Sequence, residues 1–141
     1  MTVCTSVHQL WIYSSPIADE EGFIVCMYVL EEDFPSSSFV NLRDVDVERT
    51  TGLAGERLVQ LKIRIRNCDD AVVEELRSCL GTVKDLRIGF LKEDEDFSPI
   101  LRLLDGVTVE KVVNHSLSKE LSARLMSDLS KVSFISDVMN E

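Results

Sequence analysis

Residues 58–65 read L-V-Q-L-K-I-R-I, and residues 83–90 read V-K-D-L-R-I-G-F. Apolar and polar residues alternate in both stretches, which is the period of a β-strand with one buried face. The residues expected to point into the core are Leu61, Ile63 and Ile65 in the first strand, and Leu86, Ile88 and Phe90 in the second. Between the two stretches, apolar residues recur with helical spacing at Val72, Val73, Leu76, Cys79 and Leu80. The sequence therefore predicts a strand, a crossover helix and a second, parallel strand.

The alternation of strand and helix continues after residue 90. Ser98-Pro99 is a typical helix start, so a short helix is expected over residues 100–104. Residues 107–113 (V-T-V-E-K-V-V) predict another strand. The long helix after it has an apolar face made of Leu117, Leu121, Leu125 and Leu129. Residues 132–135 predict a short final strand, and residues 136–141 are expected to fray.

Residues 1–57 predict strands and loops, and they hold three basic and ten acidic groups. Residues 7–13 are one expected strand, and the unbroken apolar run 23–30 (F-I-V-C-M-Y-V-L) predicts a central strand covered on both faces. Residues 40–47 predict a strand that forms an antiparallel hairpin with residues 58–65. The chain is thus expected to form one domain of α/β or α+β class, residues 1–141. In it, mostly antiparallel N-terminal strands continue into repeat-like β-α-β-α-β-α units over residues 58–135.

The predicted strands share a spacing of three apolar positions. Leu58-x-x-Leu61-x-Ile63 recurs as Val83-x-x-Leu86-x-Ile88, and more loosely as Leu104-x-x-Val107-x-Val109, Leu129-x-x-Val132-x-Phe134 and Leu42-x-x-Val45-x-Val47. Over residues 58–135 this spacing resembles the strand segment of leucine-rich repeats. The resemblance implies partner recognition like that of the repeat arms of adaptor proteins, including substrate-selecting ubiquitin-ligase subunits. The segment from Val45 to Leu61 is too short to contain a full helix, which favours a compact α/β domain over a horseshoe. Both arrangements remain open.

Composition narrows the classes of partner. The chain of 141 residues carries 15 Lys and Arg against 25 Asp and Glu, a net charge of -10. Nucleic-acid binding needs clustered cations, so no nucleic-acid partner is expected. The longest apolar run, residues 23–30, is too short to span a bilayer, and the N-terminal residues lack the pattern of a signal peptide. The four cysteines have no C-x-x-C spacing and are expected to be free thiols. These features predict an intracellular protein without a membrane partner, in the cytoplasm with the nucleus left open.

No motif for a metal or a cofactor is apparent. The acidic run 93–96 lacks the spaced oxygen ligands of a calcium loop. Thr51-Gly52-x-x-Gly55 is not followed by the Lys-Ser/Thr of a phosphate loop. We therefore expect no cofactor, no metal site and no catalytic residue.

Charged residues at outward strand positions are the candidate binding residues. If Leu61 pairs in register with Leu86, Lys62 lies beside Arg87 on one sheet face. Trp11 lies on the opposite strand face from Leu10 and Ile12, and an exposed Trp is a typical interface anchor. The expected partner-binding set is Lys62, Arg64, Asp85, Arg87, Asp46 and Trp11. The leading hypothesis is a non-catalytic protein–protein interaction module or adaptor subunit with a rigid mixed-charge sheet face. Its protein partner is expected to be basic, because the chain is acidic.

Two alternatives remain open. The first is a structural subunit that is stable only within a multiprotein complex, with the apolar strand 23–30 left at a sheet edge for a partner's strand. The second is a small enzyme that uses His115 with an acidic neighbour such as Glu110 or Asp94.

Overall fold

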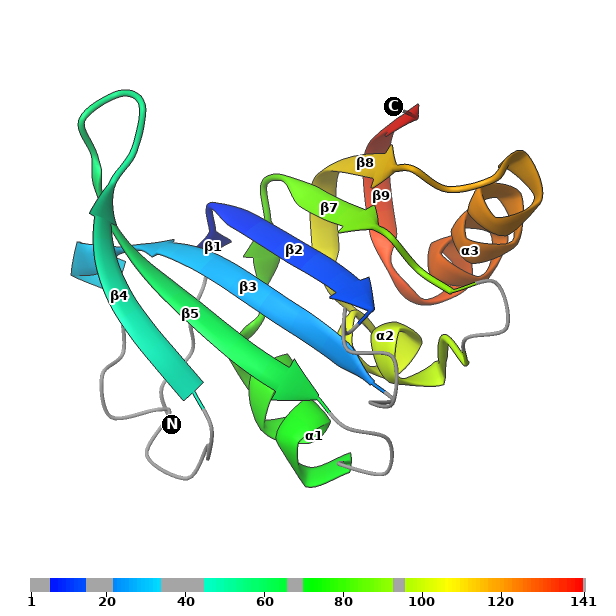
Figure 1. Cartoon of the computed structure of the whole chain (residues 1–141), viewed down its shortest axis with the longest axis horizontal. Helices are drawn as coiled ribbons and strands as arrows, with labels where there is room; N and C mark the ends of the chain where they lie inside the picture. Colours follow the sequence, from blue (N-terminus) through cyan, green and yellow to red (C-terminus); the bar gives the residue numbers. More distant parts are fainter. Residues whose placement is uncertain (1–5, 15–21, 34–44, 66–69, 93–95, 141) are drawn as a thin grey trace.

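The computed structural model describes residues 6–14, 22–33, 45–65, 70–92 and 96–140. In chain order the elements are β1 (Ser6–Val7), β2 (Gln9–Ser14), β3 (Phe23–Leu30), the 3₁₀ helix η1 (Glu31–Asp33), β4 (Val45–Thr51), β5 (Arg57–Ile65), α1 (Asp70–Cys79), β6 (Thr82–Val83), β7 (Leu86–Gly89), α2 (Ser98–Leu103), β8 (Thr108–His115), α3 (Lys119–Val132) and β9 (Phe134–Asn140). The strands form one mixed sheet and are joined by three α-helices, so the fold is α/β in content (Figure 1).

The sheet order is decided by long-range pairing. From one edge to the other, the long strands run β4, β5, β3, β2, β7, β8 and β9, and the two-residue strands β1 and β6 pair with each other at one end. The pairs among β2, β7, β8 and β9 are parallel, and those among β2, β3, β5 and β4 are antiparallel. The predicted hairpin of β4 and β5 is confirmed, whereas the expected pairing of Leu61 with Leu86 is wrong. Strands β2 and β3 lie between β5 and β7, because the N-terminal hairpin supplies the middle of the sheet.

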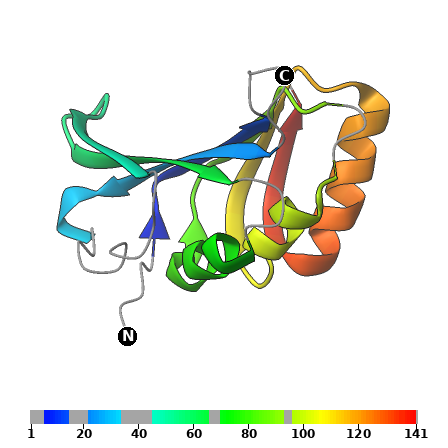
Figure 2. The ribbon, with the colours of Figure 1, turned by 60° about the horizontal axis from the view of Figure 1, so that its bottom comes forward.

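One face of the sheet is covered by the helices (Figure 2). The alternating residues Leu10, Ile12, Val25, Met27, Leu61, Ile63, Leu86 and Ile88 are buried in a single core together with Val73 and Leu76 of α1, Ile100 and Leu103 of α2, and Leu121, Leu125 and Leu129 of α3. These are apolar positions at strand and helix spacing, and their burial against each other is the main driving force for this layering. No described helix covers the opposite face, which we call the open face.

Strand β3 occupies the interior of the sheet. It pairs with β5 along its whole length on one side, and with β2 over residues 23–28 on the other. The expectation that residues 23–30 form a central strand is confirmed. The idea that this strand is left at an edge for a partner is therefore wrong, since a strand is already paired on each of its sides. The edges of the described sheet are β4 and β9.

The repeat differs from the expected one in register. Val83 pairs with Val109, and Val109 pairs with Ile135, so equivalent positions recur every 26 residues. Leu86 pairs with Val112, and the expected match to Val107 is wrong. In β6–β7 and in β8 the buried residues are three apart, Val83 with Leu86 and Val109 with Val112, and the strand pairing is interrupted between them. The next inward position after Val112 is polar. The apolar pattern of the sequence therefore predicted the wrong register for this strand.

That polar position is Asn114, which is 2% exposed. Its Nδ2 donates to Ser122 Oγ at 3.1 Å and to Asn140 Oδ1 at 3.0 Å. A buried amide is tolerated when it is hydrogen bonded, so Asn114 links β8 to α3 and to β9.

Two further expectations are corrected at the ends of elements. Residues 136–140 do not fray but belong to β9, which pairs with β8. Phe90 is not in the core: it has φ of 53° and is 63% exposed. Strand β7 ends at Gly89, and the left-handed backbone at Phe90 turns its side chain out of the strand pattern.

Candidate functional site

A row of side chains crosses the open face from strand to strand. Register pairs Arg87 with Trp11, Trp11 with Cys26, Cys26 with Lys62, and Lys62 with Asp46. Paired residues point to the same face of a sheet, so four of the six expected partner-binding residues lie in one line. The order of the strands in the sheet, which differs from their order in the sequence, creates this line.

The centre of the row is a packed aromatic and cationic group. The ring of Trp11 stacks on the ring of His115, with centroids 5.4 Å apart and an angle of 13° between the planes. The guanidinium carbon of Arg87 lies 5.3 Å from the centroid of Trp11. Arg87 Nη1 also lies 3.4 Å from His115 Nε2. Three strands, β2, β7 and β8, therefore bring these side chains into mutual contact.

A chain of hydrogen bonds fixes the orientation of this group. Trp11 Nε1 donates to Gln9 Oε1 at 2.8 Å, and Gln9 Nε2 donates to Asp85 Oδ2 at 3.2 Å. Arg87 Nε donates to the same Asp85 oxygen at 3.2 Å. We call Gln9, Trp11, Asp85, Arg87 and His115 the Trp11 cluster. Its members hold one another in place through these hydrogen bonds and ring contacts.

One atom of the Trp11 cluster lacks a partner. Asp85 Oδ1 is buried and makes no hydrogen bond. The Asp85 and Arg87 side chains are 22% and 25% exposed. This ion pair is therefore largely shielded from water, so breaking it costs more than breaking an exposed pair.

The remaining expected residues lie toward the β4 edge. Lys62 and Asp46 are exposed and face each other on β5 and β4, and Arg64 pairs with Ile24 of β3. The expectation that Lys62 lies beside Arg87 is wrong. Three strand spacings separate them, a distance of about 14 Å. The gap is filled by Trp11 and Cys26.

Tyr13 and Tyr28 flank the row. The hydroxyl of Tyr13 lies 3.7 Å from Cys26 Sγ. Burial, followed by the hydrogen bond and charge of Cys26, raises the pKa of Tyr13 to about 12. Burial also raises the pKa of Tyr28 above its usual value. Both phenols are therefore neutral at physiological pH and add amphipathic contact area to the open face.

The open face differs in charge from the chain as a whole. Its strand positions include four cations, Lys62, Arg64, Arg87 and Lys111, and three anions, Asp46, Glu48 and Asp137. A fourth anion, Asp85, lies between β6 and β7 and contacts Gln9 and Arg87 on this face. The chain carries a net charge of -10. The excess negative charge therefore lies outside these positions, and the open face is a balanced surface on an acidic protein.

Sequence reasoning named three members of the Trp11 cluster as binding residues and His115 only as a catalytic candidate. Gln9 was missed, although it lies on the same strand face as Trp11 and could have been found by that alternation. Glu110 is five residues from His115 on β8, about 17 Å along an extended strand, so it is not an acidic neighbour of His115. Asp94 lies outside the described residues.

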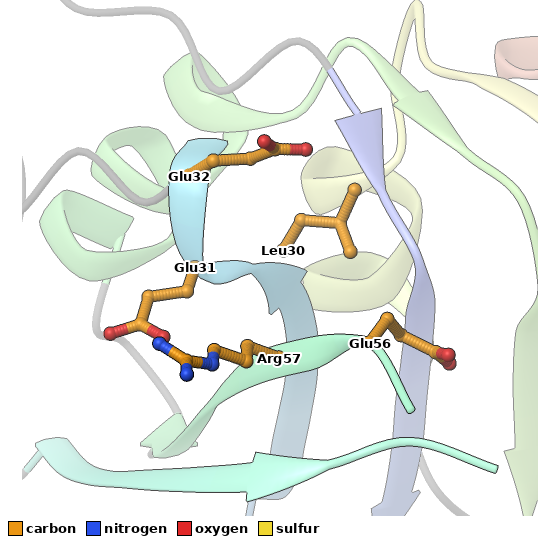
Figure 3. A pocket seen from close by; sticks show the side chains of 5 residues that line it. All are labelled: Leu30, Glu31, Glu32, Glu56 and Arg57. Carbon is orange, nitrogen blue, oxygen red and sulfur yellow. The ribbon is translucent and has the colours of Figure 1, made fainter. Parts of the chain in front are cut away.

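A separate hollow lies at the end of β3 (Figure 3). It has a volume of about 470 Å³ and is lined by Leu30, Glu31, Glu32, Glu56 and Arg57. The side chains of Glu31 and Arg57 point toward one another on one side, and Glu56 points to the other side (Figure 3). None of the expected binding residues lines this hollow.

Among the described residues, no group of three or more His, Cys, Asp or Glu side chains is placed to hold a metal ion. None of the described helices is long and apolar enough to cross a membrane. Comparison with known proteins returned no match: no family model matches the chain, and no curated protein or solved structure matches it.

Proposed function

We propose that this protein is a non-catalytic protein–protein interaction module that binds its partner on the open face. The observation that carries the proposal is the preorganised Trp11 cluster, in which an aromatic ring, a guanidinium and an imidazole are held together on a rigid sheet. Trp and Arg are enriched among the residues that dominate binding energy at interfaces. Side chains fixed before binding lose little entropy when the partner arrives.

The charged residues around the Trp11 cluster supply specificity. Lys62 and Asp46 alternate in sign along the row and are exposed. A partner with complementary alternating charges fits this row, while the negative charge of the whole chain favours a basic partner at long range. A parallel β-α arrangement with helices on one face supports partner recognition by the other face, as the leucine-rich-repeat resemblance implies. Cys26 is a free, buried thiol, which supports an intracellular setting.

The test is an affinity capture from the source cells, quantified by mass spectrometry. Three baits are compared with the wild type: Trp11→Ala, Lys62→Glu and the control Lys131→Glu. Lys131 lies on α3, on the other side of the sheet, and its side chain is 73% exposed. We expect one stoichiometric partner to be lost with both open-face variants and kept with the control.

Circular dichroism on each purified variant checks that the fold is intact. If a partner is retained equally by all three variants, the open face is not its binding surface. If the control loses the partner as well, the effect comes from overall charge, which also contradicts the proposal.

A further inference from the structure

Strand β9 is an edge strand with an unusual amount of exposed apolar surface. On its outer side it pairs with no other described strand. Phe134, Val138 and Met139 are 70%, 44% and 41% exposed. They are half of the six large apolar side chains that are exposed among the described residues. An unpaired edge of this kind is prone to accept a further strand.

The other edge of the sheet is protected. Strand β4 carries Asp46, Glu48 and Arg49 within seven residues, and charged side chains discourage pairing with another chain. Strand β9 has one charged residue, Asp137, whose register partner on β8 is Lys111. The two edges thus differ in the feature that governs strand addition.

We propose that β9 pairs in antiparallel fashion with β9 of a second copy of this chain. The sequence of the strand is self-complementary: residues 134–139 read F-I-S-D-V-M, with two apolar residues, two polar residues and two apolar residues. An antiparallel pair centred between Ser136 and Asp137 sets Phe134 opposite Met139 and Ile135 opposite Val138. Every apolar residue then meets an apolar residue.

The faces on which the residues of β9 lie make this register possible. Ile135 and Val138 pair with Val109 and Val112, which both point to the core, so they share the helix-covered face. Phe134 and Met139, the flanking residues, share the open face. Each apolar pair of the proposed dimer therefore has its two side chains on the same face, as a sheet requires.

The neighbouring registers fail. A pair centred on Asp137 places two carboxylates directly opposite each other, which is destabilising. A pair centred on Ser136 sets Phe134 of the open face against Val138 of the opposite face. Of these three registers, only the one centred between Ser136 and Asp137 keeps the carboxylates apart and sets each apolar side chain opposite one on the same face.

The dimer has a structural consequence. A two-fold axis perpendicular to the sheet keeps both open faces on the same side of one continuous sheet. Two copies of the Trp11 cluster then lie on one surface. The inference stands on β9 alone and is independent of what the open face binds.

The first test measures the oligomeric state of the full chain by sedimentation equilibrium over a range of concentrations. The paired segments are short, so we expect a weak, concentration-dependent dimer typical of interfaces below about 1,200 Å². Val138→Lys places a charge in the apolar pair and should weaken association roughly tenfold or more. Val47→Lys is the matched control, because Val47 is 47% exposed on the β4 edge. We expect it to associate as the wild type does.

The second test fixes the register by oxidation. In the double variant Phe134→Cys/Met139→Cys, each new thiol faces its counterpart in the second copy, and we expect a disulfide-linked dimer. In the single variant Phe134→Cys the two new thiols are about 17 Å apart, too far for a disulfide. The wild type, oxidised in parallel, gives the background from its own cysteines. A chain that stays monomeric at every concentration, a Val47→Lys variant that dissociates as Val138→Lys does, or equal cross-linking of the single and double variants overturns the proposal.

Discussion

Replacing Arg87 with methionine should destabilise the protein through one identifiable set of contacts. The substitution keeps an unbranched apolar stem but removes the guanidinium. Asp85 then loses its 3.2 Å hydrogen bond from Arg87 Nε and keeps only Gln9 Nε2 as a partner, because its Oδ1 already has none. The cation over the ring of Trp11 is lost as well.

The size of the effect follows from the burial of the pair. Exposed ion pairs contribute about 0–1 kcal/mol, whereas breaking a buried pair costs about 3–5 kcal/mol. At 25% and 22% exposure, the Arg87–Asp85 pair lies between these limits, nearer the buried one. Together with the contact to Trp11, which is worth about 0.5–1 kcal/mol, the expected loss in free energy of unfolding is about 2–3 kcal/mol.

The assay is urea unfolding, monitored by circular dichroism and by tryptophan fluorescence. Trp11 is the single tryptophan of the chain, so its emission reports directly on this site. The control is Arg102→Met, because the ion pair of Arg102 with Asp70 has side chains that are 45% and 65% exposed. That variant should lose less than about 1 kcal/mol.

The reasoning is refuted if the two variants lose the same stability to within about 0.5 kcal/mol, the usual scatter of surface substitutions. A double variant, Arg87→Met with Asp85→Asn, adds an internal check. Removing the carboxylate charge as well should recover part of the loss, since the cost comes mainly from an unpaired buried charge.

Three further predictions concern the same domain. In a spectrophotometric titration both tyrosines should ionise above their usual pKa, that of Tyr13 moving from 10.0 to about 12. The raised pKa makes this contribution to stability fully present below about pH 10 and lost as the pH rises toward 12. Cys26→Ala should lower the pKa of Tyr13 but leave it raised by burial, and an unchanged value would show that Cys26 has no part in the shift. Gly89→Ala should lower the free energy of unfolding in urea by about 1–3 kcal/mol. The new Cβ would lie 2.9 Å from the Cβ of His115 and 3.0 Å from its backbone oxygen. Unaltered stability would mean that β7 and β8 adjust freely. Ser118→Ala should cost about 1 kcal/mol by the same measurement, because Ser118 Oγ accepts from the N–H of Leu121 at the start of α3. Ser118→Asp should cost little, since aspartate can cap the helix in the same way. Equal losses in the two variants would argue against capping.

The local pattern of the sequence determined which side of each strand is buried. The alternation of Leu61 and Ile63 with Lys62 and Arg64 predicted the two faces of β5, and both faces are as expected. Trp11 was placed on the opposite face from Leu10 and Ile12, and this is also confirmed. Such predictions succeed because side-chain direction has a period of two along a regular strand, whatever that strand pairs with.

The sequence pattern failed where a polar residue occupies an inward position and is stabilised there by tertiary contacts. Asn114 occupies an inward position, so a search for apolar residues shifted the repeat to Val107 and Val109. Its Nδ2 donates to Ser122 and Asn140, which lie 8 and 26 residues away in the sequence on other elements. Residues 136–140 have no regular apolar alternation, and all five are exposed.

By itself, then, the sequence determined the α/β class, most of the strand and helix positions, and the buried and outward faces of β2 and β5. Only the tertiary structure decided the neighbours: β2 and β3 separate β5 from β7, and Trp11, Arg87 and His115 meet from three strands. The physical reason is that strand direction and burial depend on local periodicity, whereas the order of strands depends on backbone hydrogen bonds and core packing between segments up to a hundred residues apart. The Trp11 cluster is a product of that order, and so is the exposed edge of β9.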